Sequence, residues 1–169
     1  YLEVPLAFKQ RLTTWTLEAM VRPDSVLAGE GVIVRRLVQE LGGGTNALNY
    51  VLGVETNGSG GLRAYAGYVL ANGQRYLVSG GTIATGVYTH VAASYDNATA
   101  TLVLYVGGLP VTSNNTFNLA PPVNGKGGDT FVRIGEDFGG EIDEVRVWSV
   151  ARSAGTISSN AGKTVVSTD

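Results

Sequence analysis

Three carboxylates near the C-terminal end, Glu141, Asp143 and Glu144, have the residue type and spacing closest to an acid–base site. Enzymes that cleave glycosidic bonds use two such groups, which face one substrate from roughly 5 to 10 Å apart. Side chains alternate between the faces of a strand, so Glu144 points away from Glu141 and Asp143 unless a β-bulge intervenes. The spacing does not complete a catalytic pair. We therefore predict that the protein is not an enzyme and interpret these acids as capping or ion-pairing groups.

Other reactive side chains are scarce. The sequence has no cysteine, which excludes disulfides, thiol nucleophiles and cysteine-bound zinc. His90 is the single histidine and no nucleophile motif accompanies it, so we interpret it as a structural residue. We expect Trp15 and Trp148 to lie in strands with apolar partners, so we interpret both indole rings as part of the core and not as platforms for a ligand.

The acids, the histidine and the tryptophans are expected to lie on or beside β-strands, because apolar side chains recur with a period of two in short runs along the chain. Residues 15–21, 91–95 and 102–106 alternate in this way and end at Pro, Asp, Asn or Gly. Several such runs between turn residues predict an all-β sandwich of antiparallel strands. We also expect a strand over 32–41 and one helical turn over 153–160, with Ser153 as its N-cap.

One hairpin is predicted in more detail. The segments Leu62–Leu70 and Gln74–Ser79 flank an Asn-Gly pair at positions 72 and 73. Asn-Gly is the strongest signal for a two-residue type I′ turn, which here pairs Val69 with Tyr76. A slip of one residue would exchange the two faces. The residues expected on the core face are Leu62, Ala64, Ala66, Tyr68, Leu70, Arg75 and Leu77.

The opposite face of this hairpin carries our candidate ligand-binding residues, Arg63, Tyr65, Gln74 and Tyr76. Sugars present C–H faces to aromatic rings and hydroxyl groups to Arg and Gln, so such a face suits a saccharide. The two tyrosines are about four residues apart along the strand, or roughly 13 Å, and would contact different units of an oligosaccharide. Ordinary cross-strand pairing is the alternative interpretation.

Length and charge limit the remaining classes. The 169 residues fit one domain over 1–169, which we expect to be excised from a larger protein because no signal peptide precedes it. A net charge of −2 gives no basic footprint for nucleic acid. No apolar run approaches the roughly 18 residues of a membrane span. We therefore expect no nucleic-acid partner and no membrane insertion.

Three segments together resemble one family. TWTLEAMVRPD (14–24), YTHVAASYDNATATLVLYVGG (88–108) and IGEDFGGEIDEVRVWSVARS (134–153) are similar to the laminin G-like, concanavalin A-like jelly-roll domains, in the family's order and spacing. The resemblance implies an antiparallel two-sheet jelly-roll sandwich. It also implies an extracellular or cell-surface location, binding of glycans or protein partners, and in many members a calcium ion.

The resemblance also identifies candidate calcium ligands. In the pentraxin branch of this fold, an acidic loop preceded by glycine supplies such ligands, and Glu136 and Asp137 follow Gly135 here. Calcium takes six to eight oxygen ligands, which Asp24, Asp129 or loop carbonyls would complete. A solvated acidic turn is the alternative interpretation.

These observations lead to a functional hypothesis. We expect a non-catalytic module that binds an oligosaccharide or polysaccharide, with calcium as a candidate cofactor. The alternative is a structural or adhesive domain that packs against a protein partner or a neighbouring domain. That alternative predicts a continuous exposed apolar patch of several hundred Å².

Overall fold

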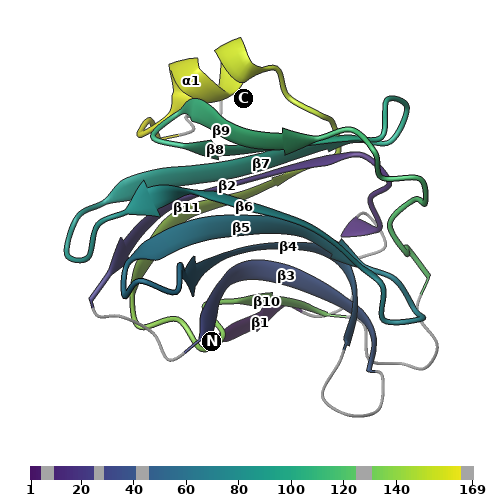
Figure 1. Cartoon of the computed structure of the whole chain (residues 1–169), viewed down its shortest axis with the longest axis horizontal. Coiled ribbons are helices and arrows are strands. Elements are labelled where there is room, and N and C mark those ends of the chain that lie inside the picture. Colours follow the sequence, from purple (N-terminus) through teal and green to yellow (C-terminus); the bar gives the residue numbers. More distant parts are fainter. Residues whose placement is uncertain (5–9, 25–28, 41–45, 125–130, 165–169) are drawn as a thin grey trace.

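The alternating apolar residues form strands that pair into two stacked antiparallel sheets (Figure 1). The structure is a computed structural model, and it describes residues 1–4, 10–24, 29–40, 46–124 and 131–164. Within these ranges the chain has eleven strands and one short helix. The predicted all-β, two-sheet jelly-roll sandwich is therefore confirmed.

The six strands of sheet A follow the order β1-β10-β3-β4-β5-β6. Their bounds are β1 Leu2–Val4, β10 Val132–Ile134, β3 Glu30–Glu40, β4 Asn46–Thr56, β5 Leu62–Val69 and β6 Arg75–Ile83. The five strands of sheet B follow the order β11-β2-β7-β8-β9. Their bounds are β11 Gly140–Trp148, β2 Trp15–Pro23, β7 Thr89–Asp96, β8 Thr101–Val106 and β9 Leu109–Asn114.

The main core fills the space between the sheets. Most apolar residues that alternate along β2, β7 and β8 are buried between the sheets, whereas Val106 is partly buried. The buried ones include Trp15, Leu17, Val91, Tyr95, Leu102 and Leu104. Trp15 contacts the rings of Tyr50 and Tyr95, with centroids 6.2 and 5.8 Å apart. Tilted aromatic pairs at such distances are favourable beyond the area that they bury. This core fixes which face of each sheet is left for other contacts.

The helix α1, Ala154–Asn160, begins where the sequence predicted. The Ser153 hydroxyl accepts a hydrogen bond from the Thr156 backbone N–H, which is the geometry of an N-cap. Its one buried residue, Ile157, packs on Ala92 and Tyr105 against the outer face of sheet B. Figure 1 shows α1 beside β8 and β9, far from the N-terminus at β1. The described part of the C-terminal segment thus covers part of sheet B.

The predicted register of the β5–β6 hairpin is wrong by one residue. Leu70 N–H donates to the Gln74 carbonyl and Gly73 N–H donates to the Leu70 carbonyl, both at 2.9 Å, so the loop has three residues. Gly73 has φ of +83°, as expected for a type I turn followed by a glycine bulge. Val69 therefore pairs with Arg75, and Tyr68 with Tyr76.

This shift reverses the two faces of β6. Tyr76 points into the core, 7% exposed, with its ring stacked on Tyr68 at 5.1 Å. Arg75 and Leu77, which we expected in the core, face outward instead. The expected core residues of β5 keep their positions, because only the strand after the turn is displaced.

Trp148 also departs from expectation. It pairs with Thr16 at the end of β11, on the outer face of sheet B, and is only partly buried. The guanidinium of Arg152 lies 4.2 Å from its ring centroid. The indole is therefore covered by a cation and not by the core.

Candidate functional site

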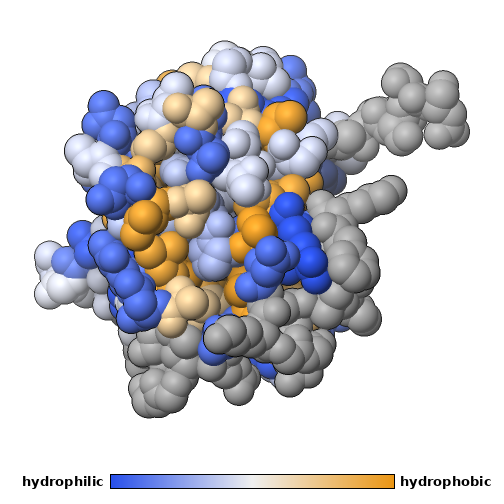
Figure 2. Space-filling view, turned by 90° about the vertical axis from the view of Figure 1, so that its right-hand side faces the viewer, coloured by the Kyte–Doolittle hydropathy of each residue, from blue (hydrophilic) through white to orange (hydrophobic). Residues whose placement is uncertain are grey.

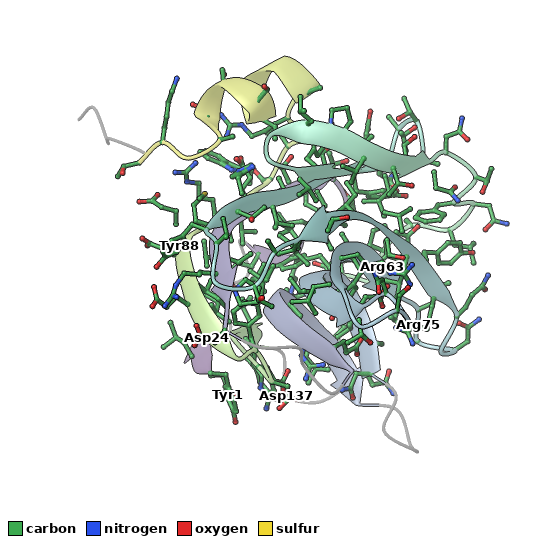
Figure 3. All side chains as sticks on the ribbon, turned by 60° about the vertical axis from the view of Figure 1, so that its left-hand side comes forward. Tyr1, Asp24, Arg63, Arg75, Tyr88 and Asp137 are labelled. Atoms are coloured by element: carbon green, nitrogen blue, oxygen red, sulfur yellow. The ribbon has the colours of Figure 1, made fainter. Side chains whose placement is uncertain are left out.

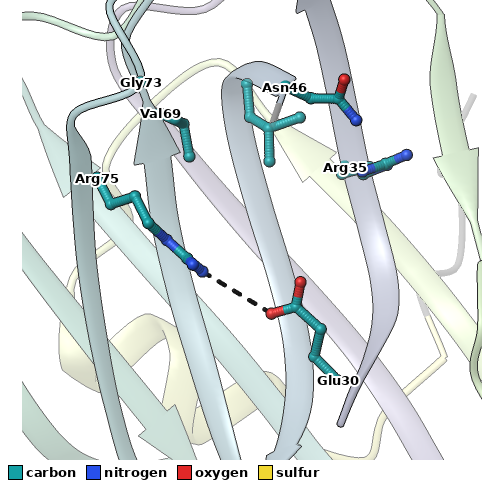
Figure 4. A pocket seen from close by; sticks show the side chains of 7 residues that line it. Glu30, Arg35, Asn46, Val69, Gly73 and Arg75 are labelled. Carbon is teal, nitrogen blue, oxygen red and sulfur yellow. Dashed lines mark ion pairs between the residues drawn. The ribbon is translucent and has the colours of Figure 1, made fainter. Parts of the chain in front are cut away.

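A hollow of about 200 Å³ opens on the outer face of sheet A, over the strands from β3 to the edge strand β6 (Figure 4). A second, smaller depression of about 30 Å³ adjoins it and shares its central residues. The side chains around the larger hollow are Glu30, Arg35, Asn46, Leu48, Val69 and Arg75, with Gly73 at the turn. The floor is apolar and the rim is polar, so the hollow offers both kinds of contact to a small polar ligand.

The floor is a separate apolar cluster on the face turned away from the core. Leu48, Val51, Tyr65 and Val69 are at most 8% exposed, and Leu77 packs against them. Tyr65 lies on this face, as predicted, but its ring is only 3% exposed. It therefore forms part of the floor and offers no open ring face for stacking.

Gly53 lets the Tyr65 ring lie flat across the sheet. The two residues are opposite each other on β4 and β5. A Cβ atom at position 53 would lie 2.6 Å from the Tyr65 hydroxyl oxygen, which is far inside van der Waals contact. Burial raises the pKa of Tyr65 well above its ordinary value, so its hydroxyl stays protonated. The floor is thus neutral.

An ion pair crosses the hollow. Glu30 on β3 and Arg75 on β6 reach toward each other over β4 and β5, with Oε2 and Nη2 3.9 Å apart (Figure 4). Their side chains are 52% and 60% exposed, so both charged ends remain accessible to a ligand. A pair this exposed contributes little to stability.

Arg35 forms the inner wall and is held by a second carboxylate. Its Nη2 lies 2.5 Å from Glu136 Oε2, and the other oxygen of Glu136 accepts from Arg133 at 2.5 Å. The Arg133 guanidinium in turn lies over the rings of Phe131 and Tyr1, at 4.3 and 4.8 Å. The acidic loop that follows β10 is therefore tied to two arginines of sheet A.

These contacts do not fit the predicted calcium site. Both oxygens of Glu136 already meet guanidinium groups, while Asp137 is exposed and Asp24 lies 3.6 Å from Arg22. Asp129 falls outside the described residues, among which no group of three His, Cys, Asp or Glu could hold a metal ion. Figure 3 shows Asp137 well away from Arg63 and Arg75. The calcium site stays a prediction, without support from the donors described.

The structure does not bring the four predicted ligand residues together. Tyr65 lies in the floor, and Gln74 is exposed in the turn beside the hollow. Arg63 shares the face, but its Nε donates to Glu55 at 2.8 Å and it does not line the hollow as described. Tyr76 faces the core, and its hydroxyl donates to Asn118 at 2.6 Å. Sequence reasoning missed the rim residues, which are Glu30, Arg35, Asn46 and Arg75.

Two carboxylates on β11, those of Glu141 and Glu144, interact with different partners. A bulge does interrupt β11 between Asp143 and Arg146, where Glu144 has φ of +52°. Glu144 pairs with Arg146 at 2.8 Å, whereas Glu141 accepts from Arg22 and Tyr88. The hydrogen bond from Arg22 is the main reason that the pKa of Glu141 lies below its ordinary value. Two acids that are paired separately with arginines do not form the set required for glycoside hydrolysis.

The outer face of sheet B holds charges of a different kind. Glu18 is fully buried, and its two oxygens lie 2.7 Å from Arg152 Nη1 and 3.3 Å from His90 Nε2. Burial acts to raise the pKa of Glu18, but hydrogen bonds from His90 and Arg152 outweigh it and hold that pKa below its ordinary value. His90 therefore has a structural contact, consistent with its predicted role.

Figure 2 shows one end of the sandwich, where exposed apolar groups are separated by polar ones. On the part of this face formed by the described residues, the apolar surface is interrupted. The adhesive alternative predicted a continuous patch, which this view does not display. No helix within the described ranges has the length and apolar character needed to cross a membrane.

The sequence matches a family model described as the concanavalin A-like lectin/glucanases superfamily, over residues 1–158. A search among curated proteins found no significant match.

Several solved structures share the fold. The CBM40 of the Ruminococcus gnavus IT-sialidase has a TM-score of 0.70 and 15% identity, over 92% of this chain and 86% of that one. It has also been solved with α2,3-sialyllactose bound. A SAP-like pentraxin from Limulus polyphemus has a TM-score of 0.65 and 15% identity, over 88% and 70%. A Bacteroides ovatus protein provisionally assigned as carbohydrate-binding has a TM-score of 0.61 and 26% identity, over 91% of this chain and 42% of that one.

Proposed function

Because the chain belongs to the concanavalin A-like lectin/glucanase superfamily, we propose that it is a non-catalytic module that binds carbohydrate in the hollow on sheet A. The observation that carries this proposal is the combination of an apolar floor with a rim of charged and amide groups over one small volume. Two of the structures with this fold are carbohydrate-binding by name, which supports the same function. A module of this kind is expected outside the cell or on its surface.

The chemistry of the hollow suits one sugar unit. The C–H face of a pyranose ring packs on Leu48 and Val69, the apolar side chains that line the larger hollow, while its hydroxyl groups meet the rim. Hydroxyl groups both donate and accept hydrogen bonds, so they can use the Arg75 guanidinium and the Glu30 carboxylate together. About 200 Å³ is below the roughly 300–1,000 Å³ of sites for drug-sized ligands. We therefore propose recognition of a terminal unit, not of a long chain.

The test is a broad glycan array with the wild-type protein and the variant Arg75→Ala. We expect binding to at least one class of glycan, and a loss of about tenfold or more in affinity when the rim guanidinium is removed. The matched control is Arg22→Ala, which removes an ion-paired arginine from sheet B and should leave binding unchanged. Complete absence of binding to the array, or equal loss in both variants, would contradict the proposal.

A second measurement addresses the floor. Val69→Phe fills the volume beneath the rim without changing any charge. We expect this variant to fold, since position 69 borders the open hollow, and to lose binding as Arg75→Ala does. Retained affinity would place the ligand elsewhere on the molecule.

A further inference from the structure

We infer that the hollow selects an uncharged sugar unit over an acidic one, an inference that rests on the carbohydrate-binding function proposed above. Five ion pairs along sheet A join four arginines to four glutamates, so four positive and four negative charges sum to zero. Their members are Arg35, Arg63, Arg75, Arg133, Glu3, Glu30, Glu55 and Glu136. An acidic ligand finds no net attraction in this set.

Arg35, in the inner wall of the hollow, would contribute little to the binding of a ligand that carries a carboxylate. Its side chain is 14% exposed, and its guanidinium already meets Glu136 at 2.5 Å. The guanidinium and the Glu136 carboxylate are in direct contact, so a sugar carboxylate would have to compete with a negative charge already in place. It would also bring a second negative charge close to Glu136, where the buried surroundings strengthen repulsion.

The rim pair of Glu30 and Arg75 also favours an uncharged ligand over an acidic one. At 3.9 Å, the Glu30 and Arg75 side chains are too far apart for a normal hydrogen bond, so both ends keep free hydrogen-bonding capacity. Neighbouring sugar hydroxyls can donate to Glu30 and accept from Arg75 at the same time. A carboxylate can only accept, and one that lies between the two side chains is repelled by Glu30 while it is attracted by Arg75. The rim thus favours hydroxyl groups over an anion.

The experiment compares matched glycans on one array: galactose-terminated chains and the same chains capped with sialic acid, together with glucose-terminated chains and their glucuronic acid counterparts. For each pair that binds, we expect the wild-type protein to bind the uncharged member at least about tenfold more tightly. Glucose and glucuronic acid have the same ring and differ only at C6, where a hydroxymethyl group is replaced by a carboxylate. This pair therefore separates the effect of charge from that of size.

The variant Glu30→Gln tests the cause. It removes the carboxylate that faces Arg75 and leaves the guanidinium free, so acidic glycans should gain about tenfold or more relative to their uncharged partners. The control Glu55→Gln makes the same change of charge on the same face, but in the Arg63 pair outside the hollow. It should leave the preference unchanged. Thermal melting of each variant verifies that it is folded.

The outcomes separate the two proposals. A wild-type preference for acidic members, or an equal shift in both variants, would overturn the inference on charge while leaving carbohydrate binding intact. If no member of any pair binds, the proposed function itself fails, and the inference fails with it. A preference for uncharged members that Glu30→Gln alone reverses would support both.

Discussion

The outer faces of the two sheets both carry glutamate–arginine pairs, but the pairs differ in solvent exposure. On sheet A, Glu30 and Arg75 are more than half exposed and lie across an open hollow. On sheet B, the Glu18 side chain is 1% exposed and Arg152 reaches it from the segment that leads into α1. Among the described residues, the segment that leads into α1 covers part of sheet B, whereas the hollow on sheet A has no such cover.

This difference separates stability from recognition. A buried charge must keep its partners, because an uncompensated ion in a low-dielectric interior is very costly. An exposed pair is stabilised little by its own attraction, so it can be rearranged by a ligand at low cost. The Glu18 contacts therefore serve folding, whereas the exposure of Glu30 and Arg75 is consistent with the binding role proposed for them.

The largest effect is expected on the closed face. Glu18→Ala leaves Arg152 and His90 without their shared carboxylate and should lower the free energy of unfolding by about 3–5 kcal/mol. Glu30→Ala is the matched control and should cost at most about 1 kcal/mol. Denaturant unfolding curves measure both. Similar losses in the two variants would mean that burial does not distinguish the faces.

The next effect concerns the floor of the hollow. A methyl group at Gly53 would displace the Tyr65 ring, so Gly53→Ala should destabilise by roughly 1–3 kcal/mol and weaken glycan binding. Gly155→Ala is the control, because position 155 lies in α1 and a Cβ there would meet only Ser153 Oγ, at an ordinary contact distance of 4.0 Å. That change should be neutral or stabilise by up to about 1 kcal/mol. Unfolding curves with a glycan titration test both, and unchanged binding by Gly53→Ala would contradict the proposed floor.

A smaller effect is expected at acid pH. The pKa of Glu18 is lower in the folded protein than in the unfolded chain, so its contribution to stability is complete above its ordinary value of about 4.3. That contribution is lost as the pH falls below this value and through the lowered pKa of the folded state. The free energy of unfolding should therefore fall more steeply below pH 4.3 in the wild type than in Glu18→Gln. Parallel curves for the two proteins would exclude Glu18 as the cause.

The smallest effect is expected for calcium. Because the Glu136 carboxylate is held by Arg35 and Arg133, we expect the melting temperature to be the same in millimolar calcium and in EDTA. A ligand that binds only the folded state, at a free concentration of 100 times its Kd, would add about 2.7 kcal/mol to the free energy of unfolding. A change of that size is readily measured. A clear rise in calcium would show that other donors form a site.

The sequence was sufficient for the sandwich, because alternation identified Trp15–Val21 and the strands that pair with it. The site was harder to predict, and a single turn shows why. An Asn-Gly pair is compatible with a two-residue or a three-residue loop, and the conformation of Asn72 decides between them. The three-residue loop moved Arg75 to the hollow and Tyr76 to the core.

Two other features could not be inferred from alternation. The register of β3 against β4 shifts between Val32 and Val34, and bulges of this kind change which residues face outward. Arg35 therefore has no readable face in the sequence. The burial of Glu18 depends on Arg152 and the C-terminal segment, which lie more than 130 residues away in the chain. Contacts between residues so far apart in the sequence do not produce a pattern that can be recognised in either segment alone.

The position of Arg152 over Trp148 has a spectroscopic consequence. Trp15 is fully buried in the main core, whereas Trp148 is partly buried under a guanidinium from the segment that leads into α1. Fluorescence of a Trp15→Phe protein would thus follow release of that segment, and fluorescence of a Trp148→Phe protein would follow loss of the core. The two indoles allow local detachment and complete denaturation to be recorded separately in one small protein.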